Sequence, residues 1–361
     1  MGLPVLIMAG GTGGHVFPAL AVARLLREWQ CEVTWMGTQK GLEARIVPAN
    51  GFPIEWLTVA GLRGKGVLAW LLAPLRLLVA LRQAVAIVRR RRPAVVLGVG
   101  GFATGPGGVA AWMLGKPLVI HEQNAIAGLT NRLLTRFARD VLEGFPGSFP
   151  ARARARCVGN PVRRDISALP TPEQRLQARK GPVRLLVFGG SLGAARLNDT
   201  VPRAVAALPA HLRPDVWHQA GERGHAQAVE SYTRAGVQGR IEPFIEDMAG
   251  AYAWADLVIC RAGALTVSEL AAVGLPAILV PFPAAVDDHQ TFNARYLTDA
   301  QAAILIADAD LTPQRLALEL QSLCPDRTRL LDMARRARGR AMPDAAETLA
   351  QAVLDAAEVD A

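Results

Sequence analysis

The residues best suited to bind a charged ligand lie in segment 261–269, whose sequence is R-A-G-A-L-T-V-S-E. The preceding apolar run 257–259 predicts a buried strand, and residues 264–270 predict the first turns of a helix. A strand-to-helix turn at Gly263 directs backbone N–H groups, together with the positive end of the helix dipole, toward an anion. Glu269, one to two turns into the helix, could accept hydrogen bonds from a neutral diol such as ribose. The alternative is an ordinary turn with Glu269 on a solvated face.

His15 is a second candidate for chemistry, because it follows the glycine loop G-G-T-G-G of residues 10–14. The loop comes after the apolar run 5–9 and before a helical pattern over residues 17–26, which predicts the opening of a Rossmann-like unit. A helix N-terminus disfavours a charged imidazole, so His15 could act as a neutral general base toward an alcohol. A structural hydrogen-bonding role remains the alternative.

Further polar residues, H-E-Q-N, follow the apolar run 118–120. Another buried strand is predicted over residues 95–99, and the glycine-rich segment 100–108 leads from it into a helix. Polar residues at the carboxyl ends of parallel strands are typical of ligand sites in open α/β sheets. His121 and Glu122 could form an acid/base pair, although neighbours on a strand point in opposite directions and one of them is then structural.

Several classes of site are disfavoured. The first glycine loop does not spell G-x-G-x-x-G, Glu32 precedes its apolar run instead of ending it, and no G-x-x-x-x-G-K-[ST] is present, so neither a dinucleotide nor a triphosphate loop is expected. Asp287, Asp288 and His289 imitate a metal site but have no fourth ligand in view. The four cysteines stand far apart without a C-x-x-C pair, which favours a reducing cytoplasm over zinc or disulfides.

These candidate residues require two α/β domains. The opening pattern recurs with a strand at 185–188, the loop G-G-S-L-G-A at 189–194 and a helix over 195–205, about 180 residues after the first. We therefore predict two Rossmann-like domains that face one another across a cleft. The expected domains are residues 1–160 and residues 161–343, and the Ala-rich helix 344–361 is expected to pack back on the first.

The charge is unevenly distributed along the 361 residues. Residues 1–160 carry 19 Lys and Arg against 7 Asp and Glu, a net charge of +12, whereas residues 161–361 carry 21 against 24, a net charge of −3. The first half should therefore meet an acidic partner, either nucleic acid or an anionic membrane.

Segment 67–88 favours the membrane. It is strongly apolar but is interrupted by Pro74, Arg76 and Arg82 and closed by the basic residues 89–92, so it suits an interfacial helix better than a transmembrane one. A buried core helix with a solvated basic end is the alternative. The N-terminus has no basic leader and does not resemble a signal peptide.

Five motifs taken together resemble the bacterial MurG family, the UDP-N-acetylglucosamine:undecaprenyl-pyrophosphoryl-muramoyl-pentapeptide N-acetylglucosaminyltransferases. They run in order from residue 5 to about residue 294: G-G-T-G-G-H at 10–15, H-E-Q-N at 121–124, V-G-N-P at 158–161, G-G-S-L-G at 189–193 and C-R-A-G-A-L-T-V-S-E at 260–269. The resemblance implies the glycosyltransferase B architecture, with an N-terminal acceptor domain and a C-terminal domain that binds UDP-N-acetylglucosamine. The implied acceptor is the lipid-linked muramoyl-pentapeptide. The implied location is the cytoplasmic face of the cell membrane, where the protein would be peripheral. The implied macroscopic partner is an anionic membrane surface, and no nucleic acid partner is implied.

The resemblance also assigns residues. It places uracil near Ile245, the ribose hydroxyls on Glu269, and the pyrophosphate at Ser191 and the helix start formed by Ala264, Leu265, Thr266, Val267 and Ser268. The remaining donor contacts fall to Arg163, Gln290, Asn124, Thr12, Gly13 and Gly14. His15 is the family's favoured base for one inverting displacement, in which the acceptor's 4-hydroxyl attacks the anomeric carbon of the α-linked donor. Helix dipoles and Arg163 would stabilise the UDP leaving group, so that no cofactor or bound metal is required.

The chain departs from the family pattern at Phe102 and Thr104, where the family usually carries Tyr and Ser, and at the plain segment 284–286. A contact by a phenolic hydroxyl is therefore lost at Phe102. Three rival functions remain: a related transferase with another lipid acceptor such as a diacylglycerol, a non-catalytic nucleotide-sugar sensor, and a dehydrogenase. Acceptor assays separate the first from the implied activity, and binding of UDP or NADH separates the others.

Overall fold

The computed structural model describes residues 2–58, 73–177, 179–190 and 193–358, and the chain divides into two compact units. Unit 1 consists of Met1–Val162 together with Met342–Ala361, and unit 2 consists of Arg163–Ala341. The expected boundary after residue 160 lies two residues before this division. The segment at the C-terminus belongs to unit 1.

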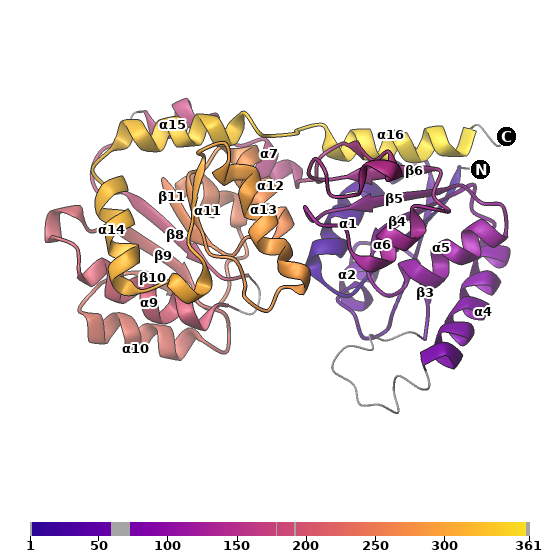
Figure 1. The fold of residues 1–361 in the computed structure, drawn as a ribbon, viewed down its shortest axis with the longest axis horizontal. Helices are drawn as coiled ribbons and strands as arrows, with labels where there is room; N and C mark the ends of the chain where they lie inside the picture. The colour runs from indigo at the N-terminus through magenta and orange to yellow at the C-terminus, as the bar shows by residue number, and fades with distance from the viewer. Residues whose placement is uncertain (1, 59–72, 178, 191–192, 359–361) are drawn as a thin grey trace. The chain divides into compact units, whose positions relative to one another are not determined.

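Unit 1 contains a sheet of seven parallel strands in the order β3-β2-β1-β4-β5-β6-β7 (Figure 1). The strands are β1 (Pro4–Ala9), β2 (Glu32–Gly37), β3 (Ile54–Trp56), β4 (Val95–Gly100), β5 (Leu118–Glu122), β6 (Asp140–Glu143) and β7 (Arg156–Cys157). The order reverses between β1 and β4, so the loops after these two strands leave the sheet toward opposite faces. A ligand crevice is expected at such a switch point.

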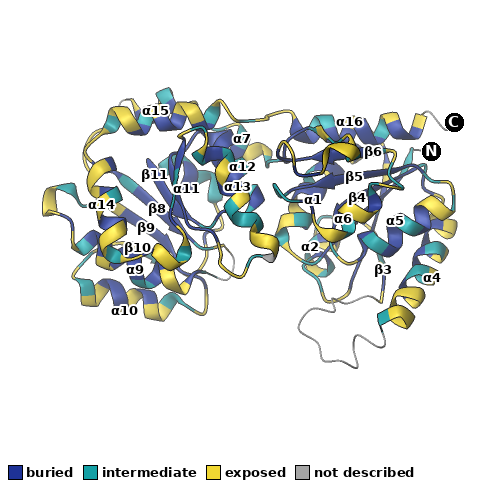
Figure 2. Ribbon diagram, viewed as in Figure 1, coloured by how far each residue is buried: buried dark blue, intermediate teal, exposed yellow. Residues whose placement is uncertain are grey.

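The helices of unit 1 cover both faces of this sheet. They are α1 (Gly13–Glu28), α2 (Glu43–Ala49), α4 (Ala73–Arg91), α5 (Thr104–Met113), α6 (Leu129–Leu134), the 3₁₀-helix η1 (Ala151–Ala153) and α16 (Ala345–Glu358). One core joins α1 and α16 to the sheet, and a second core joins α4, α5 and α6 to its other face. The strands are buried on both sides, which explains their nearly continuous apolar sequences (Figure 2).

Unit 2 repeats the design with six parallel strands in the order β10-β9-β8-β11-β12-β13. The strands are β8 (Arg184–Phe188), β9 (Asp215–Gln219), β10 (Arg240–Glu242), β11 (Leu257–Cys260), β12 (Ala277–Leu279) and β13 (Ala303–Leu305). The helices are α7 (Arg164–Ser167), α8 (Pro172–Leu176), α9 (Ala195–Ala206), η2 (Ala210–Leu212), α10 (His225–Ala235), α11 (Met248–Trp254), α12 (Ala264–Val273), η3 (Val286–Asp288), α13 (His289–Thr298), η4 (Asp308–Asp310), α14 (Pro313–Leu323) and α15 (Arg327–Arg338). Here the order reverses between β8 and β11, so the turns after both strands meet at the switch point.

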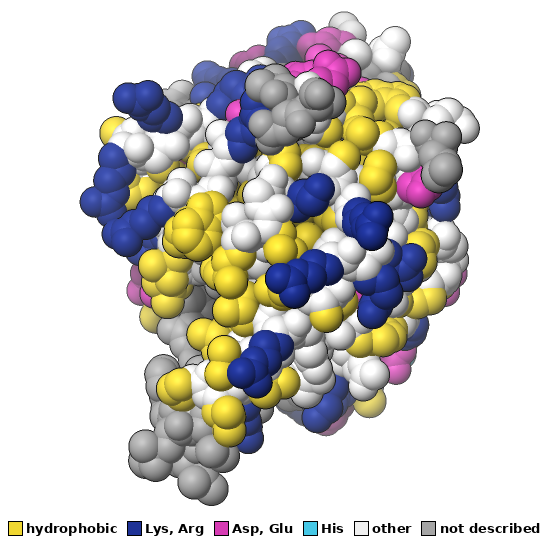
Figure 3. Space-filling view, turned by 90° about the vertical axis from the view of Figure 1, so that its right-hand side faces the viewer, with side chains coloured by type: hydrophobic (Ala, Val, Ile, Leu, Met, Phe, Trp, Pro, Cys, Tyr) yellow, Lys and Arg dark blue, Asp and Glu magenta, His cyan; other side chains and the backbone are white. Residues whose placement is uncertain are grey.

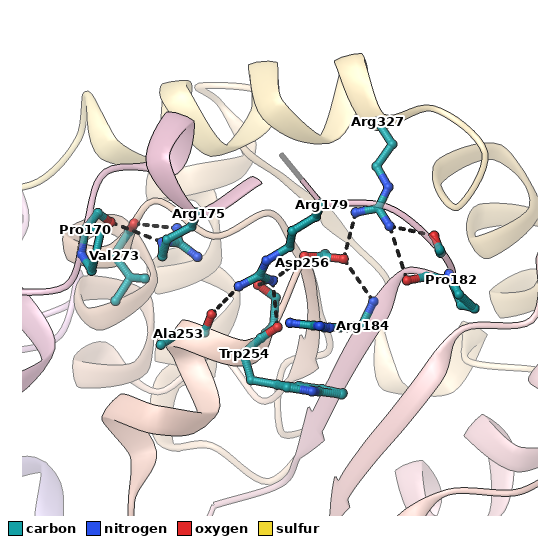
Figure 4. Close-up of polar contacts among 12 residues, drawn as sticks. Pro170, Arg175, Arg179, Pro182, Arg184, Ala253, Trp254, Asp256, Val273 and Arg327 are labelled. Atoms are coloured by element: carbon teal, nitrogen blue, oxygen red, sulfur yellow. Dashed lines mark hydrogen bonds and ion pairs between the residues drawn. The ribbon is translucent and has the colours of Figure 1, made fainter. Parts of the chain in front are cut away.

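A buried carboxylate fastens the segment that enters unit 2 (Figure 4). Asp256, only 1% exposed, forms ion pairs with Arg179 and Arg327 and accepts the backbone N–H of Arg184. Nearby, the buried Arg175 donates to the carbonyls of Val273 and Gly274 at 2.9 and 2.8 Å, and burial lowers its pKa to about 10. These contacts hold α8 against the end of α12, and they hold the start of β8 and the start of α15 against Asp256.

Two expected helix starts are wrong. Helix α1 begins at Gly13 rather than residue 17, and α5 begins at Thr104 although residues 100–108 were expected to form a loop. Packing explains the second difference, since a Cβ on Gly107 would lie 2.1 Å from Met8 Sδ and one on Gly108 would lie 2.8 Å from Leu134. Close approach to β1 and α6 thus favours glycine inside this helix despite its low helix propensity.

The expected interfacial segment 67–88 is described only from residue 73, where α4 begins, and its earlier part lies outside the described residues. The described part of this segment has two kinds of side chain: Ala80, Ala84, Ile87 and Val88 are buried in the core, as the second alternative expects, whereas Leu75, Leu77, Leu78 and Val79 are 40–60% exposed. Contact with a membrane stays a prediction. Within the described part of the chain, no helix combines the length and apolarity that crossing a membrane requires.

Candidate active site

In unit 2, the anion site that the sequence predicts falls at the start of α12. Gly263 has extended backbone angles and caps a helix whose first backbone bond joins Val267 N–H to Gly263 C=O at 2.9 Å. Ala264, Leu265 and Thr266 precede that bond, so their N–H groups have no carbonyl partner within the helix. Val267 and Ser268 complete the first turns. The geometry therefore offers N–H donors and a helix dipole to an anion.

The turn before α12 is held rigid from α13. Gln290 accepts N–H groups from both Ala262 and Phe282, at 3.2 and 2.9 Å, and the buried Asn293 donates to Ala262 C=O at 3.1 Å. The side-chain oxygen of Gln290 thus fixes the backbone, which leaves its amide nitrogen as the part suited to a ligand. Arg261 is also structural, since it forms an ion pair of 2.6 Å with Asp308.

Glu269 lies near two groups that stabilise its charge. Tyr252, fully buried on α11, donates its hydroxyl to Glu269 Oε2 at 2.9 Å. Burial nevertheless raises the pKa of Glu269 to about 7, against the opposing effects of this hydrogen bond and of Arg163. Unit 2 therefore places Glu269 and Arg163, two of the predicted donor contacts, within electrostatic reach of each other. The resulting carboxylate can change its charge near neutral pH.

Of the remaining predicted residues of unit 2, Ile245 lies between β10 and α11. Ile245 is buried just before α11, and Gln219 at the end of β9 donates to the carbonyls of Gly190 and Pro243, each at 3.2 Å. Gln219 therefore connects the second glycine loop with the segment that carries Ile245. Ser191, the predicted phosphate ligand, lies outside the described residues.

In unit 1, His15 is the third residue of α1. Its N–H donates to the carbonyl of Thr12, the helix N-cap, at 3.1 Å. The imidazole lies against the end of β4, because a Cβ added to Gly100 would be 2.7 Å from His15 Cδ2. Gly100 also has φ +112°, which favours glycine on two grounds. Thr12 and Gly14 are exposed and Gly13 is half-buried, so this helix start is accessible.

Asn124, two strands away from His15 at the same edge of the sheet, is oriented by Glu122. One carboxylate oxygen of Glu122 accepts both the backbone N–H and the side-chain amide of Asn124, at 3.0 and 3.1 Å. The other oxygen accepts from Gly128 N–H and Asn131 Nδ2, at 3.0 and 2.9 Å. Glu122 is 3% exposed and occupied by four donors, so it positions Asn124 and does not act on a substrate.

The suggested acid/base pair of His121 and Glu122 is therefore wrong. His121 is also fully buried, with Nε2 2.9 Å from Gly159 C=O and Nδ1 2.9 Å from Gln123 Nε2. Burial lowers the pKa of His121 to about 4. Both ring nitrogens are thus occupied: Nε2 joins β5 to the segment that leads out of unit 1, and Nδ1 holds the side chain of Gln123.

Phe102 and Thr104, two of the three departures from the family pattern, lie in different environments. Phe102 is 52% exposed, so its ring is available at the surface without a hydroxyl. Thr104 is fully buried, and its hydroxyl lies 3.1 Å from Met8 C=O and 2.9 Å from Gly100 C=O. Thr104 therefore connects β1, β4 and α5 and does not face a ligand.

Sequence reasoning missed Tyr252, Gln219 and the positioning role of Glu122, because their partners come from other strands or helices. A signal existed only for Glu122, which stands inside H-E-Q-N. Among the residues that the structure describes, no group of three or more His, Cys, Asp or Glu side chains is placed to hold a metal ion.

Comparisons with known proteins match both units. The glycosyltransferase family 28 N-terminal domain matches residues 5–143, and the family 28 C-terminal domain matches residues 184–349. The UDP-N-acetylglucosamine–N-acetylmuramyl-(pentapeptide) pyrophosphoryl-undecaprenol N-acetylglucosamine transferase of Alkalilimnicola ehrlichii is 60% identical over 99% of this chain and 100% of its own length. The protein of the same name from Nitrosococcus oceani is 57% identical over 99% of both chains.

Solved structures agree with these matches. The crystal structure of Acinetobacter baumannii MurG is 40% identical and has a TM-score of 0.85, covering 98% of this chain and 99% of that one. A more distant neighbour, Os79 from O. sativa in complex with UDP, is 13% identical with a TM-score of 0.69 over 98% of this chain and all of its own. This second likeness concerns the fold alone.

Proposed function

The chain belongs to the MurG family of N-acetylglucosaminyltransferases within glycosyltransferase family 28, and from this membership we propose how its residues carry out the transfer. It has the glycosyltransferase B fold. The enzyme transfers N-acetylglucosamine from UDP-N-acetylglucosamine to the lipid-linked muramoyl-pentapeptide, in the synthesis of peptidoglycan.

Unit 2 binds the donor in this proposal. The α12 N-terminus and Arg163 receive the diphosphate, Glu269 accepts the ribose hydroxyls, and the segment at Ile245 receives uracil. The observation that carries the assignment is the arrangement of Glu269, Tyr252 and Arg163 beside a helix start whose first N–H groups have no carbonyl partner within the helix. An anion and a neutral diol that are joined in one molecule, as in UDP, match these two adjacent sets of groups.

Unit 1 binds the acceptor and supplies the base. The oxygen of the acceptor's 4-hydroxyl attacks the anomeric carbon, the bond from that carbon to the UDP oxygen breaks, and the configuration inverts from α to β. His15 takes the hydroxyl proton, for which its position at the start of α1 favours the neutral imidazole. The helix dipole and Arg163 stabilise the negative charge that develops on UDP, and we propose that no metal or cofactor is needed.

The membrane partner belongs to the same proposal. Exposed apolar side chains from α4, α5 and α6 lie on one face of unit 1 among basic residues, and Figure 3 shows few acidic side chains there. This membrane face comprises Leu75, Leu77, Leu78 and Val79 of α4, Trp112 and Met113 of α5, and Leu129 and Leu133 of α6. A groove of ≈ 290 Å³ beside it is lined by residues that include Trp112, Lys116, Arg136, Phe137 and Arg139, and it contains no carboxylate. Such a surface suits an anionic lipid leaflet.

The basic cluster 89–92 contributes less to this surface than the sequence suggests. Arg90 and Arg91 form ion pairs with Glu55, at 2.5 and 2.7 Å.

A vesicle assay tests the membrane face. At low salt the protein should bind phosphatidylglycerol vesicles, and Leu75→Glu combined with Leu78→Glu should abolish most of that binding. Leu318→Glu, at a 63% exposed position of α14 in unit 2, is the matched control. Equal binding by both variants would contradict the assignment.

The activity itself is tested by transfer of labelled N-acetylglucosamine from its UDP donor to a short-chain muramoyl-pentapeptide lipid. UDP-glucose and UDP-N-acetylgalactosamine serve as competing donors. Selective transfer of N-acetylglucosamine is the expected result. If UDP binds but no sugar is transferred, the acceptor assignment is wrong and a diacylglycerol acceptor should be assayed next.

A further inference from the structure

Glu43, the first residue of α2, is a carboxylate inside unit 1 that the proposed reaction does not use. Its side chain is 0% exposed. Glutamate is seldom fully buried unless its carboxylate has partners. Its surroundings supply donors only. Glu43 Oε2 accepts Gly11 N–H at 2.8 Å, and Oε1 accepts both the N–H and the hydroxyl of Thr38, at 2.9 and 2.7 Å. Three donors facing two oxygens match an ionised carboxylate.

Glycine residues make room for this carboxylate. A Cβ on Gly10 would lie 2.5 Å from Glu43 Oε1, one on Gly41 would lie 2.0 Å from Oε2, and one on Gly37 would lie 2.7 Å from Cγ. The three glycines come from the loop after β1, the end of β2 and the turn before α2. The space that the Glu43 side chain occupies therefore requires glycine at these three positions.

The loop that Glu43 contacts leads directly to His15. Gly11 has φ +92°, and the preceding Gly10 donates to Gly100 C=O at 3.3 Å. Helix α1 begins two residues after Gly11, and the His15 ring lies against Gly100. The bond from Glu43 to Gly11 therefore fixes the first glycine loop from the side of β2, while β4 fixes it from the other side.

We propose that Glu43 is a positioning residue for catalysis, an internal anion that holds the first glycine loop so that α1 presents His15 in its reactive place. This role rests on the proposed function of His15. In a dinucleotide-binding unit, a carboxylate beyond the second strand accepts hydrogen bonds from the ribose of the cofactor. In unit 1 the backbone and Thr38 take both oxygens, so this carboxylate serves the chain's own loop and not a nucleotide.

Glu43→Gln tests the role of the charge with almost no change in shape. Either orientation of the amide places its NH₂ group against a backbone N–H, of Gly11 or of Thr38, so one hydrogen bond is replaced by two opposed donors. We expect kcat to fall about 10- to 100-fold, as for a small displacement of a catalytic group, while the Kd for UDP stays within about twofold of wild type. Acceptor and donor should both be saturating.

Glu143→Gln is the matched control. Glu143 is also buried, at 5% exposure, and accepts the N–H groups of Gly147 and Phe149 at 2.8 and 3.3 Å, in a loop that carries no proposed site residue. It should retain kcat within about threefold, because its loop positions no reacting group. Both proteins are assayed below their unfolding transitions, so that loss of folded protein does not enter the comparison.

A double-mutant cycle with His15→Ala distinguishes positioning from general damage. If Glu43 acts through His15, Glu43→Gln should cost less than about threefold in the His15→Ala background, whereas independent effects would multiply. Wild-type kcat in Glu43→Gln, an equal loss in Glu143→Gln, or full multiplication in the cycle would overturn the inference while leaving His15 as the base. Full turnover in His15→Ala alone would overturn both.

Discussion

At the scale of single residues, Glu269 should couple donor binding to pH. Its pKa of about 7 means that the carboxylate form, which accepts hydrogen bonds from both ribose hydroxyls, is gained as pH rises through neutrality. The affinity for UDP-N-acetylglucosamine should therefore rise between pH 6 and 8, since the diphosphate keeps its charge over this range. Glu269→Gln should weaken binding about tenfold or more and remove the pH dependence. Calorimetric titrations across this range measure both effects.

Tyr252→Phe tests more specifically whether Glu269 controls the pH dependence of donor binding. The Tyr252 hydroxyl lowers the pKa of Glu269, so its removal should move the midpoint of donor binding to higher pH. Tyr232→Phe is the control, because the Tyr232 hydroxyl lies 2.9 Å from His218 Nδ1 and not near Glu269. A midpoint that is equal in all three proteins would show that another group controls the titration.

His15→Ala should lower kcat about 100-fold or more and leave the donor's Kd nearly unchanged. The reason is that the imidazole is assigned to the acceptor's hydroxyl, whereas the groups assigned to the uracil, ribose and diphosphate of UDP belong to unit 2. Single-turnover kinetics with pre-bound donor separate the chemical step from binding. An unaltered rate would remove His15 as the base.

At the scale of elements, two glycines of unit 2 should respond differently to alanine. Gly263 caps α12 with φ −62°, and the nearest neighbour of an added Cβ would be 3.6 Å away. Gly263→Ala should therefore change the free energy of unfolding by less than about 1 kcal/mol. It should nevertheless weaken donor binding, because the new methyl group would contact the ligand. Gly193 has φ +72°, and its Cβ would lie 2.1 Å from Ala220 C=O, so Gly193→Ala should destabilise the protein by more than that. Thermal unfolding and UDP titration separate the two effects. Normal donor affinity in Gly263→Ala would contradict a close approach of the diphosphate.

Elements were the part of the fold that the sequence predicted best. Continuous apolar runs identified β1, β4, β8 and β11, because strands buried on both faces need apolar residues throughout. The start of α5 was missed, since its glycines are selected by packing against Met8 and Leu134 and such contacts are not encoded locally. The same limit applied to the site, where only locally encoded features could be predicted. Glu269 was found from its place in a helix, whereas Tyr252, on a different helix, could not be paired with it before the fold was known.

At the scale of the whole molecule, the C-terminal helix completes unit 1. Leu349 and Val353 of α16 are fully buried in a core with α1 and the sheet. Leu349→Ala should therefore destabilise unit 1 by about 2–5 kcal/mol while unit 2 still binds UDP. Unfolding followed by a probe in each unit, such as Trp35 fluorescence for unit 1 and UDP binding for unit 2, checks this expectation. Loss of UDP binding in parallel with unit 1 would contradict the independence of the two folds.

The division into two units gives the enzyme its separate tasks. Each unit contains one parallel sheet with a switch point, and we assign the groups that bind UDP and the catalytic base to different switch points. Charge follows the same division, since the net positive charge lies in residues 1–160, which carry the proposed membrane face. The sequence predicted this division from two similar glycine loops, while the internal roles of Glu43 and Glu122 became visible only when distant segments were placed together.

We propose that the enzyme performs a single inverting displacement, in which the acceptor's 4-hydroxyl attacks the donor's anomeric carbon without a metal. The most direct test is to determine, by NMR of the product, the linkage and anomeric configuration of N-acetylglucosamine transferred in the presence of a chelator. We expect undiminished transfer and a β-(1→4)-linked sugar. An α-linked product, a different linkage, or loss of transfer that added Mg²⁺ restores would contradict it.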